Sequence, residues 1–138
     1  METNTKSISR PQHKSLWEFK LEQRFKATIV LLILNGKVEK ALEILAKKHG
    51  VRVPIIEVGL PKRNKRKALG CYNGKKRTIS VLNSDTLKDP FVILHEFYHH
   101  LRTTGDAKHR GTEKYANTFA KEYIEAYRSM AIQETGND

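Results

Sequence analysis

The apolar residues of this sequence change their spacing twice, and this change constrains the fold more than any other feature. Up to His49 they recur at intervals typical of amphipathic helices, which predicts two helices over about residues 16–33 and 38–49. Asn35-Gly36 and Gly50 stand where these helices should end, because both residue types suit the backbone of a helix C-terminus. The first part of the chain is therefore expected to be a helical scaffold.

From residue 51 onward the pattern becomes that of β-strands. Runs of apolar and β-branched residues predict strands over 51–58, 68–72 and 77–82. Asn73-Gly74 should join the last two strands as a hairpin, because both residues tolerate the positive φ of a tight turn.

Helical spacing returns after Asp89-Pro90, where proline suits the first turn of a helix. Two further helices are predicted over about 90–102 and 112–133. The order of elements predicts an α+β domain whose helices pack on one face of a small sheet. Residues 1–14 show no apolar period and are interpreted as a flexible N-terminal arm, and residues 15–138 as a single domain.

Composition narrows the classes of function. The 138 residues include 26 Lys or Arg and 15 Asp or Glu, a net charge of +11 that favours nonspecific contact with nucleic acid or other acidic surfaces. The single cysteine, Cys71, excludes an internal disulfide framework and suits a reducing compartment. No apolar run approaches the ~20 residues of a membrane span. The N-terminus lacks the apolar core of a signal peptide, so we expect a cytoplasmic protein.

The predicted helix over 90–102 carries an H-E-x-x-H motif formed by His95, Glu96 and His99. Residues four apart lie one turn apart on the same helix face, so two imidazoles can bind one Zn²⁺. Glu96 is offset from this pair by about 100° and can take a proton from a water on the metal. The motif therefore predicts a zinc site with Glu96 as the catalytic residue.

A catalytic zinc needs a third protein ligand. The metzincin pattern would require glycine and histidine where this chain has Arg102 and Gly105, so that class is excluded. His100 lies about 140° around the helix from His95 and cannot easily share its metal.

Three further residues are candidates for the third ligand: Asp106, His109 and Glu113. Glu113 is favoured, because a helix packed antiparallel to the first would direct it toward the histidines. Ala116 and Ala120 would allow the two helices to approach closely. The alternative role of Glu113 is a first-turn carboxylate that stabilises the helix dipole.

The motif, followed by Glu113-x-x-Ala116-Asn117-x-Phe119-Ala120, resembles the gluzincin metallopeptidases. The resemblance is greatest to the compact ImmA/IrrE-type members and the minigluzincins, and covers about residues 51–125. It implies a small zincin-like fold, Zn²⁺ held by His95, His99 and Glu113, and Glu96 as general base and acid in peptide-bond hydrolysis.

The resemblance also implies secondary roles. Asn117 matches a position from which an amide could orient a histidine ligand. Tyr98 stands where many relatives have glycine. Candidates for stabilising the transition state are Tyr72, His109, Tyr115 and Tyr123. A latent form is compatible with the resemblance, since some minigluzincins resemble latent enzymes.

The expected partner is a protein or peptide substrate lying extended along a sheet edge. An alternative function is that of a basic nucleic-acid-associated domain, or of a regulatory domain, with a structural or inactive zinc site.

A basic stretch supports contact with phosphates, and its alternative role is a solvated loop that protects a sheet edge. That stretch comprises Lys62, Arg63, Lys65, Arg66 and Lys67, and Lys75, Lys76 and Arg77 lie beyond the hairpin turn. Cys71 is expected to be a buried apolar residue rather than a fourth zinc ligand.

Overall fold

The computed structural model describes residues 15–62, 68–104 and 112–136. Four α-helices, one short 3-10 helix and three strands make up this part of the chain, which confirms the predicted α+β class. The elements are α2 (Leu16–Leu34), α3 (Val38–His49), β1 (Ile55–Val58), β2 (Gly70–Asn73), β3 (Thr78–Val81), η1 (Ser84–Lys88), α4 (Pro90–Thr104) and α5 (Thr112–Gly136). The predicted arm, residues 1–14, lies outside the described residues.

The helices begin and end at residues whose chemistry fixes them there. Ser15 and Glu18 form a capping box at the start of α2, with each side chain accepting from the other's backbone N–H. Gly50 ends α3 with a left-handed φ of 67°, as its position predicted. The Asp89 carboxylate accepts from the N–H groups of Phe91 and Val92 at 3.0 and 3.3 Å, which fixes the start of α4.

The three strands form one mixed sheet in the order β1-β3-β2. β3 pairs in parallel with β1 and antiparallel with β2. The strand predicted over 51–58 is shorter than expected, because the Val51 N–H bonds to the Ala46 carbonyl at the end of α3 and Pro54 has no N–H to donate. Consequently only Ile55–Val58 pairs with β3.

The predicted hairpin is confirmed, but its turn is longer than the Asn-Gly pair. Asn73 pairs with Thr78, so residues 74–77 form a four-residue loop. The Asn73 side chain accepts from the N–H groups of Lys75 and Lys76, and Arg77, rather than the Asn-Gly pair, has the positive φ.

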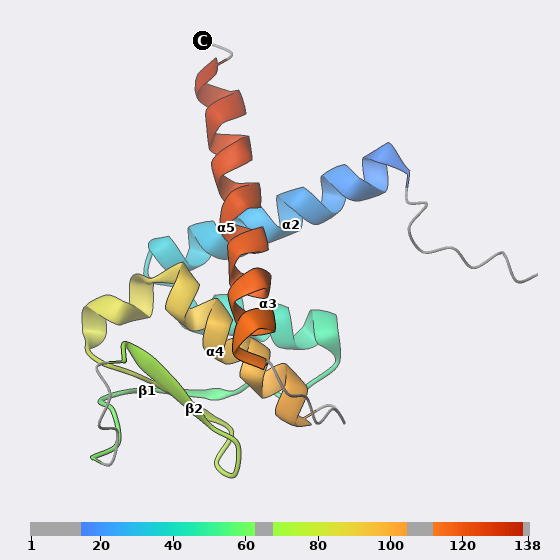
Figure 1. Cartoon of the computed structure of the whole chain (residues 1–138). Helices are drawn as coiled ribbons and strands as arrows, with labels where there is room; N and C mark the ends of the chain where they lie inside the picture. The colour runs from blue at the N-terminus through green and yellow to red at the C-terminus, as the bar shows by residue number, and fades with distance from the viewer. Residues whose placement is uncertain (1–14, 63–67, 105–111, 137–138) are drawn as a thin grey trace, which may run out of the picture.

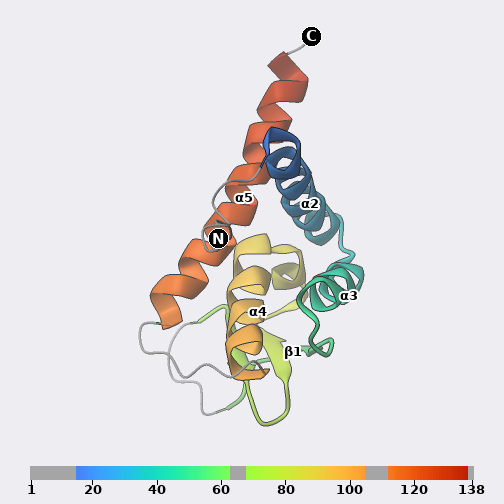
Figure 2. The ribbon, with the colours of Figure 1, turned by 90° about the vertical axis from the view of Figure 1, so that its right-hand side faces the viewer.

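Helix α4 is the centre of the fold. It packs against β2 and β3 on one side and against α5 on another, and α2 crosses α5 (Figures 1 and 2). The core includes fully buried residues from four elements, α2, α3, β3 and α4: Ile29, Ile33, Leu42, Leu45, Ile79, Val81, Ile93, Leu94 and Phe97. The helices thus cover one face of the sheet, as the order of elements predicted.

The first two turns of α2 extend past the helices that bury its second half (Figure 1). Leu16, Trp17, Phe19 and Leu21 are therefore half-exposed or more, although they belong to the apolar pattern that predicts the helix.

Candidate metal centre

His95 and His99 lie on the same face of α4, as their spacing requires. Their ring centroids are 5.0 Å apart and their Nε2 atoms are 3.3 Å apart. Both side chains are largely shielded from solvent, with exposed fractions of 13% and 18%. Burial lowers the pKa of His99, which favours the neutral ring that binds metals.

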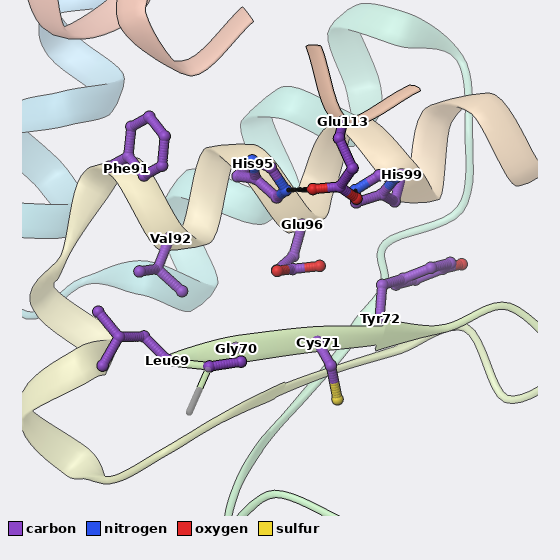
Figure 3. Close-up of a pocket in the computed structure, with 11 residues that line it drawn as sticks. Leu69, Gly70, Cys71, Tyr72, Phe91, Val92, His95, Glu96, His99 and Glu113 are labelled. Carbon is purple, nitrogen blue, oxygen red and sulfur yellow. Dashed lines mark hydrogen bonds and ion pairs between the residues drawn. The ribbon is translucent and has the colours of Figure 1, made fainter. Parts of the chain in front are cut away.

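Glu113, in the first turn of α5, completes the group. Its Oε1 lies 3.0 Å from His95 Nε2 and its Oε2 lies 2.9 Å from His99 Nε2 (Figure 3). Ala116 and Ala120, both fully buried, allow α5 to pack closely on α4 and bring Glu113 within reach. The predicted convergence of two imidazoles and one carboxylate from the next helix is therefore observed.

The geometry of these three side chains fits a divalent metal ion. Tetrahedral zinc with bonds of ~2.0–2.1 Å separates two ligand nitrogens by about 3.3 Å. The observed separation of the two Nε2 atoms is 3.3 Å, and the carboxylate oxygens lie only slightly closer to each nitrogen. His95, His99 and Glu113 thus form a possible metal site.

Glu96 lies next to this site but points in another direction. Its carboxylate lies between α4 and β2, below the two histidines (Figure 3), and the residue is only 8% exposed. Burial, with a smaller contribution from the negative charge of Glu113, raises the pKa of Glu96 to about 7.

Gly70 leaves the space that the Val92 side chain occupies beside Glu96. A Cβ at this position would lie 2.7 Å from Val92 Cγ1 and 3.5 Å from Glu96 Cγ. Glycine therefore lets β2 approach α4 closely enough to cover the carboxylate.

The site opens into a cavity of about 680 Å³ between α4, α5 and β2. Its polar wall carries the two histidines and the two glutamates, and its apolar wall includes Leu69, Phe91 and Val92 (Figure 3). The Phe91 ring lies 5.8 Å from the ring of His95. Since β2 pairs only with β3 in the described sheet, its other edge is open beside this cavity.

His100 lies on the buried face of α4 and does not join the group, as its angular offset predicted. It is fully buried, its Nε2 donates to the Arg52 carbonyl at 2.7 Å, and its Nδ1 accepts from the Tyr72 hydroxyl at 2.7 Å. Donation to a carbonyl requires the proton on Nε2, which leaves Nδ1 as the acceptor. The Tyr72 hydroxyl is thus directed to His100 rather than into the cavity (Figure 3).

None of the other candidates that the structure describes is part of the group of metal-ligating side chains. The Cys71 thiol points away from the histidines (Figure 3), and burial raises its pKa. Tyr115 is half-exposed and Tyr123 is buried in the core. The buried Nδ1 of His95 has no hydrogen-bond partner among the described residues, so Asn117 does not orient this ring. Asp106 and His109 lie outside the described residues.

The basic stretch is described only in part. Lys62 is exposed and ends the described segment before β2, whereas Arg63, Lys65, Arg66 and Lys67 lie outside the described residues. Lys75, Lys76 and Arg77 are exposed in the hairpin turn. Contact between nucleic acid and the stretch from Lys62 to Lys67 stays a prediction.

Comparisons with protein families, with curated proteins and with solved structures find no match. The function must therefore be inferred from the residues of this chain and their geometry. Within the described residues, no helix is both long enough and apolar enough to cross a membrane.

Two features of the site could not be read from the sequence. One is the Tyr72–His100–Arg52 chain of hydrogen bonds, which joins β2, α4 and the segment before β1. The other is the close contact at Gly70. The only sequence signal for the hydrogen bonds of His100 was that this residue directly follows the motif and lies on a different helix face.

Proposed function

We propose that this chain is a zinc-dependent metallopeptidase of the gluzincin type that hydrolyses a peptide bond in a protein substrate. The observation that carries the proposal is the convergence of His95, His99 and Glu113 beside the buried carboxylate of Glu96. A cytoplasmic location, suggested by the single cysteine, belongs to the same proposal.

The residues of the chain suit the successive needs of hydrolysis. Zinc bound by this donor set supplies a Lewis acid and a water of lowered pKa. Glu96, from its position between α4 and β2, takes the proton of the attacking water and passes it to the leaving amine. Its burial keeps the carboxylate away from bulk solvent and close to the reacting groups.

The open edge of β2 suits an extended peptide. Backbone groups of residues 70–73 can pair with the substrate main chain, which places the peptide along the cavity beneath α4. Leu69, Phe91 and Val92 then provide an apolar surface for a neighbouring substrate side chain. This arrangement makes an unfolded or flexible segment of protein the expected substrate.

The number of ligands favours catalysis over a structural zinc site. A structural zinc usually has four protein ligands, whereas a catalytic zinc has three and an open position. The group found among the described residues has three members, and it opens into the cavity. This observation supports the peptidase over a regulatory domain with closed zinc coordination.

The first test is the zinc content of purified protein after mild chelation, measured by mass spectrometry of the metal. The wild type should retain one zinc per chain, and Glu113→Gln should retain much less. Glu125→Gln provides a matched control, because Glu125 is an exposed carboxylate on the same helix. Full zinc content in Glu113→Gln would place the third ligand elsewhere.

The second test is hydrolysis of an unfolded protein by the zinc-loaded chain, followed by mass spectrometry of the products. We expect new peptide termini that appear with zinc and disappear with a chelator. Zinc bound in full without any cleavage across a broad set of unfolded substrates would favour the regulatory alternative.

A further inference from the structure

A second hollow lies away from the metal group, at the end of α4. It has a volume of about 450 Å³ and is lined by Gly50, Val51, Arg52, Gly74, Arg77, Thr103 and Thr104. These residues come from the end of α3, the hairpin turn and the end of α4, which meet at one end of the molecule (Figure 1). We call this feature the arginine hollow.

Each of the two arginines is held in place by its backbone. The Arg52 carbonyl accepts from His100, which is fully buried. The Arg77 carbonyl accepts from the Ile55 N–H at 2.9 Å, where β1 begins. The two guanidinium groups therefore extend from fixed points of the fold rather than from loosely attached loops.

Arg77 has an uncommon backbone conformation. Its φ of 49° is the only positive φ of a non-glycine residue in the described part of the chain. Glycine or asparagine suits such a position better, since a Cβ disfavours the left-handed region. An arginine at this position is unfavourable for the turn, which points to a role for its side chain.

The hollow has a strongly positive character. Among the described residues, none that line the hollow is acidic, and Arg52 and Arg77 form no ion pair. Lys75 and Lys76 stand exposed in the same turn, and their backbone is fixed by the Asn73 side chain. Thr103 adds a hydroxyl group to the wall, whereas the Thr104 hydroxyl already donates to the His100 carbonyl at 2.8 Å. Two guanidinium groups with a nearby hydroxyl and lysines suit phosphate oxygens.

We propose that the arginine hollow binds the phosphate backbone of a single-stranded nucleic acid. The neighbouring lysines of the turn would contact successive phosphates, which a ligand with a single phosphate does not offer. No aromatic ring from the described part of the chain lines the hollow, so binding should depend on the backbone and little on the base sequence. This activity is separate from peptide hydrolysis and does not require a metal ion.

The test is the fluorescence anisotropy of a labelled oligothymidylate of about a dozen nucleotides, titrated with full-length chain at several salt concentrations. Arg77→Gly and Arg52→Gln should each weaken binding at least about fivefold at low salt. Each should also make the dependence of log K on log salt shallower by about 0.7, the value for one lost contact with single-stranded phosphate.

Arg77→Gly separates binding from folding. Glycine suits the positive φ, so its Tm should equal or exceed that of the wild type while binding is weakened. Lys40→Gln is the charge-matched control, because Lys40 is exposed near the start of α3 and far along that helix from Gly50. Its affinity should stay within about twofold of the wild type.

Three results would overturn the proposal. Equal weakening by Lys40→Gln would show that only the net charge matters, and unchanged binding in both arginine variants would exclude the hollow. Competition by inorganic phosphate, with chloride at matched ionic strength as the reference, identifies the ligand. If free phosphate binds as tightly as the oligonucleotide, the hollow is a site for that ion and not for a nucleic acid.

Discussion

Two faces of helix α4 carry histidines in opposite environments. On the buried face, His100 has both ring nitrogens in hydrogen bonds of 2.7 Å, one with Tyr72 and one with the Arg52 carbonyl. On the cavity face, His95 directs Nε2 toward Glu113 and His99, and its buried Nδ1 has no partner among the described residues. Both ring nitrogens of His100 thus have hydrogen-bond partners, whereas Nδ1 of His95 has none among the described residues.

The difference follows from the geometry of the helix. Four residues return a side chain to the same face, so His95 and His99 share one direction. Five residues rotate it by about 140°, so His100 enters the core instead. His100, whose ring nitrogens both form hydrogen bonds within the fold, has a structural role. The cluster of His95, His99 and Glu113 instead suits a cation, because its nitrogens and oxygens converge on one point. Substitutions on the two faces should therefore affect different properties.

The largest expected effect lies on the cavity face. Glu96→Gln should lower kcat/KM for peptide hydrolysis by about 10²–10⁴, because loss of a general base removes proton transfer. Zinc content should stay at the wild-type value, since Glu96 is not part of the ligand group. Steady-state kinetics with a peptide substrate and metal analysis of the same samples measure the two properties.

Glu125→Gln, an exposed carboxylate on α5, is the control for the loss of one negative charge. Undiminished hydrolysis by Glu96→Gln would remove Glu96 from the mechanism. Loss of zinc in that variant would instead make Glu96 a ligand.

The second prediction compares the two faces directly. His100→Ala should lower the free energy of unfolding by about 2–5 kcal/mol, because it leaves a cavity and removes the partners of two polar groups. His95→Ala should change the free energy of unfolding by less than about 1 kcal/mol and abolish stoichiometric zinc binding. Urea unfolding of the metal-free proteins provides the comparison. Equal destabilisation by both variants would mean that the two faces do not differ in role.

Much of the fold follows from local sequence signals. The periods of the apolar residues, with the caps at Gly50 and Asp89, predicted the four helices because these features act within one or two turns. The short β1 and the longer hairpin turn were not predicted. Their bounds depend on hydrogen bonds to other segments, such as that from the Ile55 N–H to Arg77.

The candidate site divides in the same way. The spacing of His95 and His99 fixes their common face, so the sequence alone predicted the pair. The approach of Glu113 depends on how α5 packs on α4, which the small residues Ala116 and Ala120 suggested but could not fix. The partners of His100 come from residues 28 and 48 positions earlier in the chain, and no local pattern indicates such contacts.

The third prediction tests the contact that covers Glu96. Gly70→Ala should lower the free energy of unfolding by about 1–3 kcal/mol, because its Cβ would overlap Val92 and force β2 from α4. Hydrolysis should fall as well, because the carboxylate of Glu96 loses its cover. Thermal unfolding and kcat/KM of the same preparation measure both effects.

A double-mutant cycle provides the control. Val92→Ala removes the side chain that the new Cβ would meet, so the pair should be more stable than the sum of the two single effects predicts. Strict additivity would show that the space at residue 70 is not limited by Val92.

The smallest expected effect concerns His49, an exposed histidine that lies outside the ligand group. Its ring lies 6.0 Å from that of Phe97 and 6.3 Å from that of Phe119. Partial burial of the ring, with a smaller contribution from the charge of Lys48, lowers the pKa of His49 below its ordinary value of 6.5. The unfolded chain therefore takes up this proton at a higher pH than the folded chain. The contribution of the neutral His49 ring to stability is present above its pKa of 6.5 in the unfolded chain and is lost as the pH falls below that pKa.

The Tm of His49→Gln should thus fall less than that of the wild type between neutral and mildly acidic pH. An identical decline in both proteins would mean that the aromatic surroundings of His49 do not favour its neutral form.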